Sequence, residues 1–154
     1  MTTTQAHRPT LAAMYVGLVL TVVQTVAPYV DRAASHELAD HIRAGYPAYN
    51  QDRIDSAVTT WLVLLSVVGV LGIGGWTLAI WAVRTQRRWS RWGATAMCGI
   101  GVCVALAALL TKDTSGEVGL APVLGWLGML PCAAGLAAVA MLWTRPGRLV
   151  ARDA

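Results

Sequence analysis

Residues 56–83 read SAVTTWLVLLSVVGVLGIGGWTLAIWAV, a run of 28 residues without Asp, Glu, Lys or Arg. An α-helix rises about 1.5 Å per residue, so roughly 20 residues cross a bilayer hydrocarbon core of about 30 Å. Three further uncharged runs flank this one, at residues 9–30, 92–111 and 118–144. Backbone groups in lipid must bond within their own segment, so each run is expected to be a helix. The sequence therefore predicts an all-α fold, a four-transmembrane-helix bundle.

The predicted spans cover approximately residues 10–30, 57–83, 93–111 and 121–143, within one integral membrane domain over residues 1–154. The first run follows Arg8 and offers no good cleavage site, so we interpret it as a retained helix rather than a signal peptide. Composition agrees with this class, because 56% of residues are hydrophobic and 13% are charged. A soluble domain would have about twice that charged fraction, and nucleic-acid binding is not expected.

Basic residues are distributed unevenly between the segments that connect the spans. The amino terminus, the second loop and the carboxyl tail hold eight basic residues and one acid, Asp153. The first and third loops hold four basic residues and seven acids. Cytoplasmic segments of bacterial membrane proteins are enriched in Lys and Arg. We therefore expect a multi-pass membrane protein with both termini in the cytoplasm, and the net charge of +4 reflects this topology.

Several functional classes are disfavoured by what the spans lack. No Asp, Glu, Lys, Arg or His falls inside any span, whereas ion-coupled carriers usually place an ionisable group at membrane depth. Haem-binding spans would need His. Three cysteines, Cys98, Cys103 and Cys132, fall inside spans without a C-x-x-C pair. Carrier, haem and disulfide-reductase functions are therefore not expected, and no cofactor is predicted.

Small residues recur at helical spacing in the predicted second, third and fourth spans. They are Ser66, Gly69, Gly72, Gly74 and Gly75; Gly93, Gly101, Ala105 and Ala108; and Gly125, Gly128, Cys132 and Gly135. Small residues let helix backbones approach closely in lipid, so this pattern indicates tight bundle packing. The glycines within residues 68–76 lack the Lys-Ser/Thr pair of a phosphate-binding loop.

One face of the first span is more polar than the rest of it. Thr21 and Gln24 share this face, where Gln24 is expected to form an interhelical hydrogen bond of about 0.6–2 kcal/mol. The alternative interpretation is that both residues line a ligand cavity in the outer half of the bundle. Tyr46, Tyr49 and Trp61 would complete the lining of that cavity.

The first loop, residues 31–55, predicts a short amphipathic helix on the outer side. Asp31 or Ser35 is suited to cap it, and Leu38 and Ile42 form an apolar stripe that would face the bundle. Asn50 is expected to start an extension of the second membrane helix.

The other side of this short helix carries His36, Glu37, Asp40 and His41. Imidazole and carboxylate groups are zinc ligands, so these four residues are a candidate metal site. The sequence HELADH does not match H-E-x-x-H, however, because its histidines are five residues apart. The ordinary explanation is a solvated amphipathic helix, and titration of the two histidines would make that helix sensitive to acid.

The stretch Asp40–Leu62, DHIRAGYPAYNQDRIDSAVTTWL, is followed later by KDTSGEVGL ahead of a span that contains a proline. Arg outnumbers Lys by eleven to one, and Ala, Val and Gly are abundant. In these features the chain resembles small four-span integral membrane proteins of high-GC, actinobacterial-type bacteria that have no assigned function. The resemblance implies this fold and a place in the bacterial cytoplasmic membrane, and it implies no activity.

These observations favour a small, non-enzymatic accessory or interaction subunit that packs through small-residue helix faces. Besides the lipid bilayer, its expected partner is a second copy of the chain or another membrane protein. The alternative function is a binder or enzyme for a lipophilic small molecule, in a cavity beneath the outer-loop helix, with His36, Asp40 or His41 as its polar groups. A further alternative is an oligomeric channel, because four such helices alone would pack shut.

Overall fold

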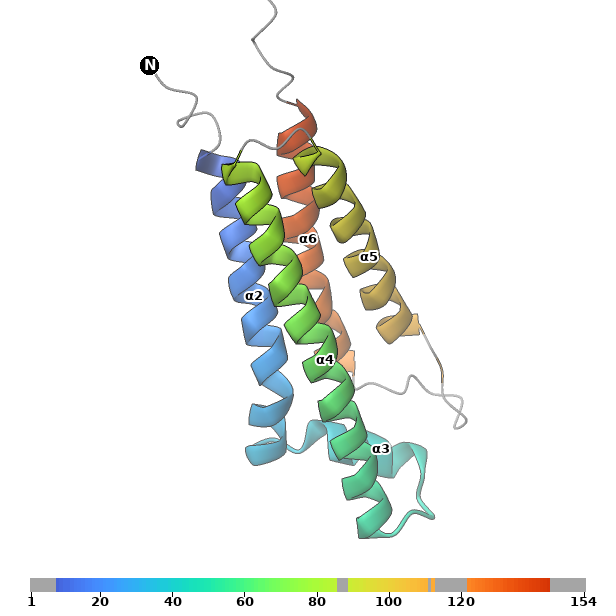
Figure 1. Ribbon diagram of the computed structural model, residues 1–154. Coiled ribbons are helices and arrows are strands. Elements are labelled where there is room, and N and C mark those ends of the chain that lie inside the picture. Colours follow the sequence, from blue (N-terminus) through green and yellow to red (C-terminus); the bar gives the residue numbers. More distant parts are fainter. Residues whose placement is uncertain (1–7, 86–88, 111, 113–121, 145–154) are drawn as a thin grey trace, which may run out of the picture.

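The computed structural model describes residues 8–85, 89–110, 112 and 122–144. Helices account for most of these residues, and no strand is found among them. Figure 1 shows five helices in this described part: α2 (Arg8–Ala33), α3 (Glu37–Gly45), α4 (Gln51–Arg84), α5 (Ser90–Leu110) and α6 (Pro122–Thr144).

Four of the helices, α2, α4, α5 and α6, are long and apolar enough to cross a membrane. Many of their apolar side chains lie on the outside of the bundle, as at Val19 (59% exposed) and Leu71 (68% exposed). Water would not favour so much exposed apolar surface, whereas lipid does. The prediction of an all-α membrane protein with four helices that can span the bilayer is confirmed.

The helix ends differ from the predicted spans mainly at α4. This helix begins at Gln51 instead of residue 57, because the Asn50 side chain accepts a hydrogen bond from the Arg53 N–H (3.1 Å) and caps it. The predicted extension of this helix from Asn50 is therefore confirmed. The predicted span ends at residues 111 and 121 lie outside the described residues.

The long helices lie side by side along the bundle (Figure 1). α2 packs along both α4 and α6, while α5 packs mainly along α6 and less closely along α4. The first residue of α2 and the last residue of α6 lie at the same end of the bundle, and α3 lies at the opposite end (Figure 1). The even number of long helices explains this arrangement.

Glycine allows close helix contacts at several of the predicted small-residue positions. A Cβ at Gly17 would collide with the Trp76 ring, and one at Gly69 would collide with the Thr25 side chain. Close neighbours also face the other glycines of the interior, namely Gly72, Gly75, Gly125, Gly128 and Gly135. The packing prediction is confirmed there. It is wrong for Gly74 and Gly101, because both face open space.

Candidate functional site

The short helix α3 is held against the end of α2 by one buried carboxylate. Asp31 is 7% exposed, and its Oδ1 accepts hydrogen bonds from the Ser35 hydroxyl (2.8 Å) and the Glu37 N–H (2.9 Å). Its Oδ2 accepts the Leu38 N–H (3.0 Å). A carboxylate suits the positive end of a helix dipole, so Asp31 caps α3 from a distance in sequence. The prediction that Asp31 or Ser35 provides the cap is confirmed for Asp31.

The chain bends sharply between α2 and α3. His36, the residue directly before α3, has a left-handed backbone conformation (φ 60°, ψ 19°), and its N–H donates to the Asp31 carbonyl oxygen (2.8 Å). Such a conformation costs a non-glycine residue about 1–2 kcal/mol. The hydrogen bonds of Asp31 offset that cost and fix the direction of α3.

The apolar side of α3 packs on α4. Leu38 and Ile42 are buried in a cluster with Ile54, Val58 and Leu62. Tyr46, Tyr49 and Trp61 are partly buried against this cluster, and the rings of Tyr46 and Tyr49 stack with centroids 4.6 Å apart. The prediction that Leu38 and Ile42 face the bundle is confirmed.

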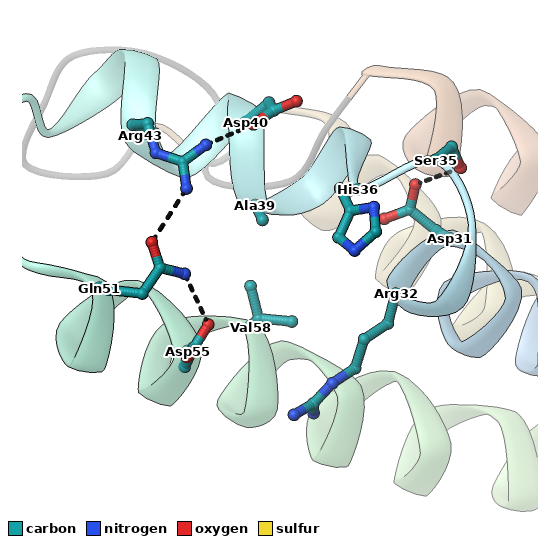
Figure 2. A pocket seen from close by; sticks show the side chains of 10 residues that line it. All are labelled: Asp31, Arg32, Ser35, His36, Ala39, Asp40, Arg43, Gln51, Asp55 and Val58. Atoms are coloured by element: carbon teal, nitrogen blue, oxygen red, sulfur yellow. Dashed lines mark hydrogen bonds and ion pairs between the residues drawn. The ribbon is translucent and has the colours of Figure 1, made fainter.

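Beside this contact, the end of α2 and the facing sides of α3 and α4 enclose a pocket of about 510 Å³. Eight of its ten lining residues have an ionisable group, an amide or a hydroxyl, and one of the eight is the histidine at the bend (Figure 2). The lining residues are Asp31, Arg32, Ser35, His36, Ala39, Asp40, Arg43, Gln51, Asp55 and Val58.

A chain of polar contacts crosses the pocket from α3 to α4 (Figure 2). Arg43 forms an ion pair with Asp40 (Nη1 to Oδ1, 2.6 Å) and donates to the Gln51 side-chain oxygen (3.1 Å). The Gln51 amide nitrogen then donates to Asp55 Oδ1 (3.1 Å). These side chains are exposed, so each contact contributes little stability, about 0–1 kcal/mol for the ion pair. Their effect is to fix the polar wall of the pocket.

The basic side chains at the α2 end of the pocket, Arg32 and His36, form fewer contacts. Arg32 Nη1 donates one long hydrogen bond to Thr59 Oγ1 on α4 (3.3 Å). Within the described part of the chain, the His36 ring has no hydrogen-bond or ion-pair partner. Both side chains are therefore available to a ligand.

The four predicted metal ligands do not gather at one point. His36 and Asp40 line the pocket, whereas Glu37 and His41 do not. His36 precedes α3 in a left-handed conformation, so helical spacing does not apply to it. Among the described residues, no three His, Cys, Asp or Glu side chains form a group that could hold a metal ion. The structure gives the metal-site prediction no support.

The five predicted ligand-binding residues lie in two separate places, and none lines the pocket. Tyr46, Tyr49 and Trp61 pack around the α3–α4 cluster. Thr21 is buried in the bundle, where its hydroxyl accepts from Trp76 Nε1 (2.9 Å) and donates to the Gly17 carbonyl (2.8 Å).

Gln24, on the same face of α2 as Thr21, lies against Gly128 of α6. Within the described residues its amide makes no hydrogen bond to a neighbouring helix, so the predicted interhelical bond is not found.

Sequence reasoning missed Arg32, Arg43, Gln51 and Asp55 as members of one pocket. One signal was available, because Arg32 and Asp55 lie at the two ends of the first loop, next to uncharged runs. The packing of α3 across the bundle end brings them together, and this depends on the bend at His36.

The outer side of α5 is a second surface of interest. Ala96, Gly99, Cys103 and Ala107 are exposed and follow one another at spacings of three or four residues. A Cβ added at Gly99 would meet no atom within 4 Å. We call these four residues the α5 small-residue face. The exposed Gly74 of α4 differs, since large exposed side chains such as Val70 and Leu78 surround it.

Scans of protein-family models, curated proteins and solved structures found no match to this chain. Its function must therefore be inferred from its own surfaces.

Proposed function

We propose that this protein is a non-enzymatic accessory subunit of the bacterial cytoplasmic membrane, with both termini in the cytoplasm, and that it docks a partner's transmembrane helix. The observation that carries the proposal is the α5 small-residue face, Ala96, Gly99, Cys103 and Ala107. The chain's resemblance to small four-span proteins of high-GC bacteria is compatible with such a role.

Small residues on a membrane helix matter most where another helix approaches. Lipid tails gain little from contact with Gly or Ala, whereas a second backbone gains van der Waals contacts and weak hydrogen bonds. Inside the bundle, most of the glycines already serve this purpose, as at Gly17 and Gly69. The α5 small-residue face has the same composition and no covering helix among the described residues.

The lipophilic-ligand alternative receives less support. Its five predicted residues are divided between the bundle interior and the α3–α4 cluster. The pocket that does lie beside α3 is mostly polar, with Ala39 and Val58 as its apolar lining residues. The channel alternative would place its ion path between copies of the chain, because close contacts such as that between Trp76 and Gly17 fill the bundle interior.

The experiment compares two variants in which an exposed glycine is replaced by leucine. The full chain is released gently from its own membrane, and its assembly is measured by native mass spectrometry. Gly99→Leu is expected to weaken association by about 1–3 kcal/mol, because the added side chain separates the two backbones. Gly74→Leu, on an exposed part of α4, is the matched control and should retain the assembly. A second copy and a different membrane protein are distinguished by mass.

Two outcomes would contradict the proposal. The wild-type chain could leave its membrane as a bare monomer, or Gly99→Leu and Gly74→Leu could have the same effect on the assembly.

A further inference from the structure

The pocket between α2, α3 and α4 lies at one boundary of the membrane. Arg32 follows the uncharged run of residues 9–30 by two positions, and Asp55 directly precedes the uncharged run of residues 56–83. Both residues line the pocket. Lipid headgroups lie at the level where uncharged spans end. The pocket volume of about 510 Å³ falls within the range of roughly 300–1,000 Å³ found for small-molecule sites.

Arg32 and Asp55 present opposite charges in this pocket and are not paired to each other, whereas Arg43 and Asp40 form an ion pair. Arg32 donates to the Thr59 hydroxyl (3.3 Å), which in turn donates to the Asp55 backbone carbonyl one helical turn away (2.8 Å). The Asp55 carboxylate accepts from the Gln51 amide, and no ion pair of Asp55 is found among the described residues. One turn of helix rises about 5.4 Å. A guanidinium and a carboxylate therefore line the pocket about one turn apart.

Apolar surface continues from the pocket toward the middle of the membrane. The seam between α2 and α4 is joined by a hydrogen bond between the Tyr29 and Ser66 hydroxyl groups (2.5 Å). Exposed valines flank it, such as Val26 and Val30 on α2 and Val63 on α4. A ligand held in the pocket by a polar group would have apolar helix surface directly beside it.

We propose that the pocket binds the headgroup of a zwitterionic phospholipid that carries a primary amine. The phosphate lies against Arg32, whose planar fork of donors suits phosphate oxygens, and the His36 ring adds a donor at the same end. The ammonium lies against the Asp55 carboxylate, and the acyl chains run along the exposed valines. The ligand thus bridges Arg32 and Asp55, which do not form an ion pair with each other.

The charge of the pocket favours a zwitterion over an anionic lipid. Three aspartates and two arginines line it, so its formal charge is negative when His36 is neutral. A headgroup with net negative charge would meet Asp31, Asp40 and Asp55 without an amine to offset them. The amine thus determines which lipid headgroup the pocket prefers, and the phosphate contributes the contact with Arg32.

The test uses the full-length protein in detergent and native mass spectrometry with three added probes. Phosphatidylethanolamine, phosphatidylglycerol and water-soluble glycerophosphoethanolamine are each titrated. We expect one phosphatidylethanolamine to bind about tenfold more tightly than phosphatidylglycerol. Arg32→Gln and Asp55→Asn should each reduce phosphatidylethanolamine affinity by about tenfold, because each removes a charge-assisted contact.

Matched controls are Arg8→Gln, at the other end of α2, and Asp52→Asn, on the first turn of α4 outside the pocket lining. Both should bind phosphatidylethanolamine as the wild type does. If glycerophosphoethanolamine binds to the wild type and does not bind to Asp55→Asn, the pocket recognises the headgroup itself, and a soluble molecule with this headgroup can also bind. Equal affinity for the two lipids would overturn the proposal, as would pocket and control variants with the same affinity.

Discussion

At the scale of single residues, the Asp31 side chain connects the end of α2 to the start of α3. Its carboxylate lies in the last turn of α2, accepts two N–H groups of α3 and accepts the Ser35 hydroxyl, so it sets the position of the pocket wall. The sequence indicated this role, because Asp is a preferred capping residue at a span boundary. It did not indicate that His36 would take a left-handed conformation, since no local pattern requires it.

The first prediction concerns this cap. In Asp31→Asn an NH₂ group, which only donates, replaces one of the two acceptor oxygens. One N–H in the first turn of α3 therefore loses its hydrogen-bond partner. We expect a loss of about 1–3 kcal/mol in local stability. Hydrogen exchange measured by mass spectrometry should show faster exchange in residues 37–45 and no change in the middle of α4. Glu37→Gln, at an exposed position, is the control. Unchanged exchange in Asp31→Asn would show that the cap is dispensable.

At the scale of helices, the sequence predicted the four long helices, because each follows from a long uncharged run. It did not predict which faces of these helices contact each other. Four spans follow from hydropathy, and the longer α4 follows from Asn50. Which glycines lie inside the bundle could not be predicted. Gly72 and Gly74 are two residues apart in one helix, yet the Thr21 side chain faces Gly72 while open space faces Gly74. This difference depends on which face of α4 is turned toward α2, and the amino-acid composition of the helix does not determine that.

The second prediction tests that rotation with two identical substitutions. Gly17→Ala places a methyl group against the Trp76 ring and disturbs the Trp76–Thr21 hydrogen bond. Gly74→Ala adds the same methyl group in open space. Both gain helix propensity, by about 1 kcal/mol, so their difference reports the contact alone. We expect Gly17→Ala to be less stable than Gly74→Ala by about 1–3 kcal/mol in thermal unfolding in detergent. Equal stability would contradict the described α2–α4 packing.

At the scale of the whole molecule, the candidate site arises where three segments meet. Charges at the ends of two spans are visible in the sequence, but the pocket exists only because α3 returns across the bundle end. The metal prediction treated residues near in sequence as near in space, whereas the cavity prediction combined residues of separate segments that the structure does not bring together. The buried side of α3 packs with Tyr46 and Tyr49 in one cluster on α4, and the adjoining side of α3 carries the polar wall of the pocket. The two proposed surfaces, the pocket and the α5 small-residue face, lie on different helices and can be tested separately.

The most direct test of the central claim is photo-crosslinking in the native membrane. Ile100, which is exposed beside the α5 small-residue face, is replaced by benzoylphenylalanine, and Leu71 on α4 is replaced in the same way as a control. A protein adduct of discrete mass is expected from position 100, and only lipid adducts are expected from position 71. Lipid adducts alone from both positions would contradict the docking of a partner helix on α5.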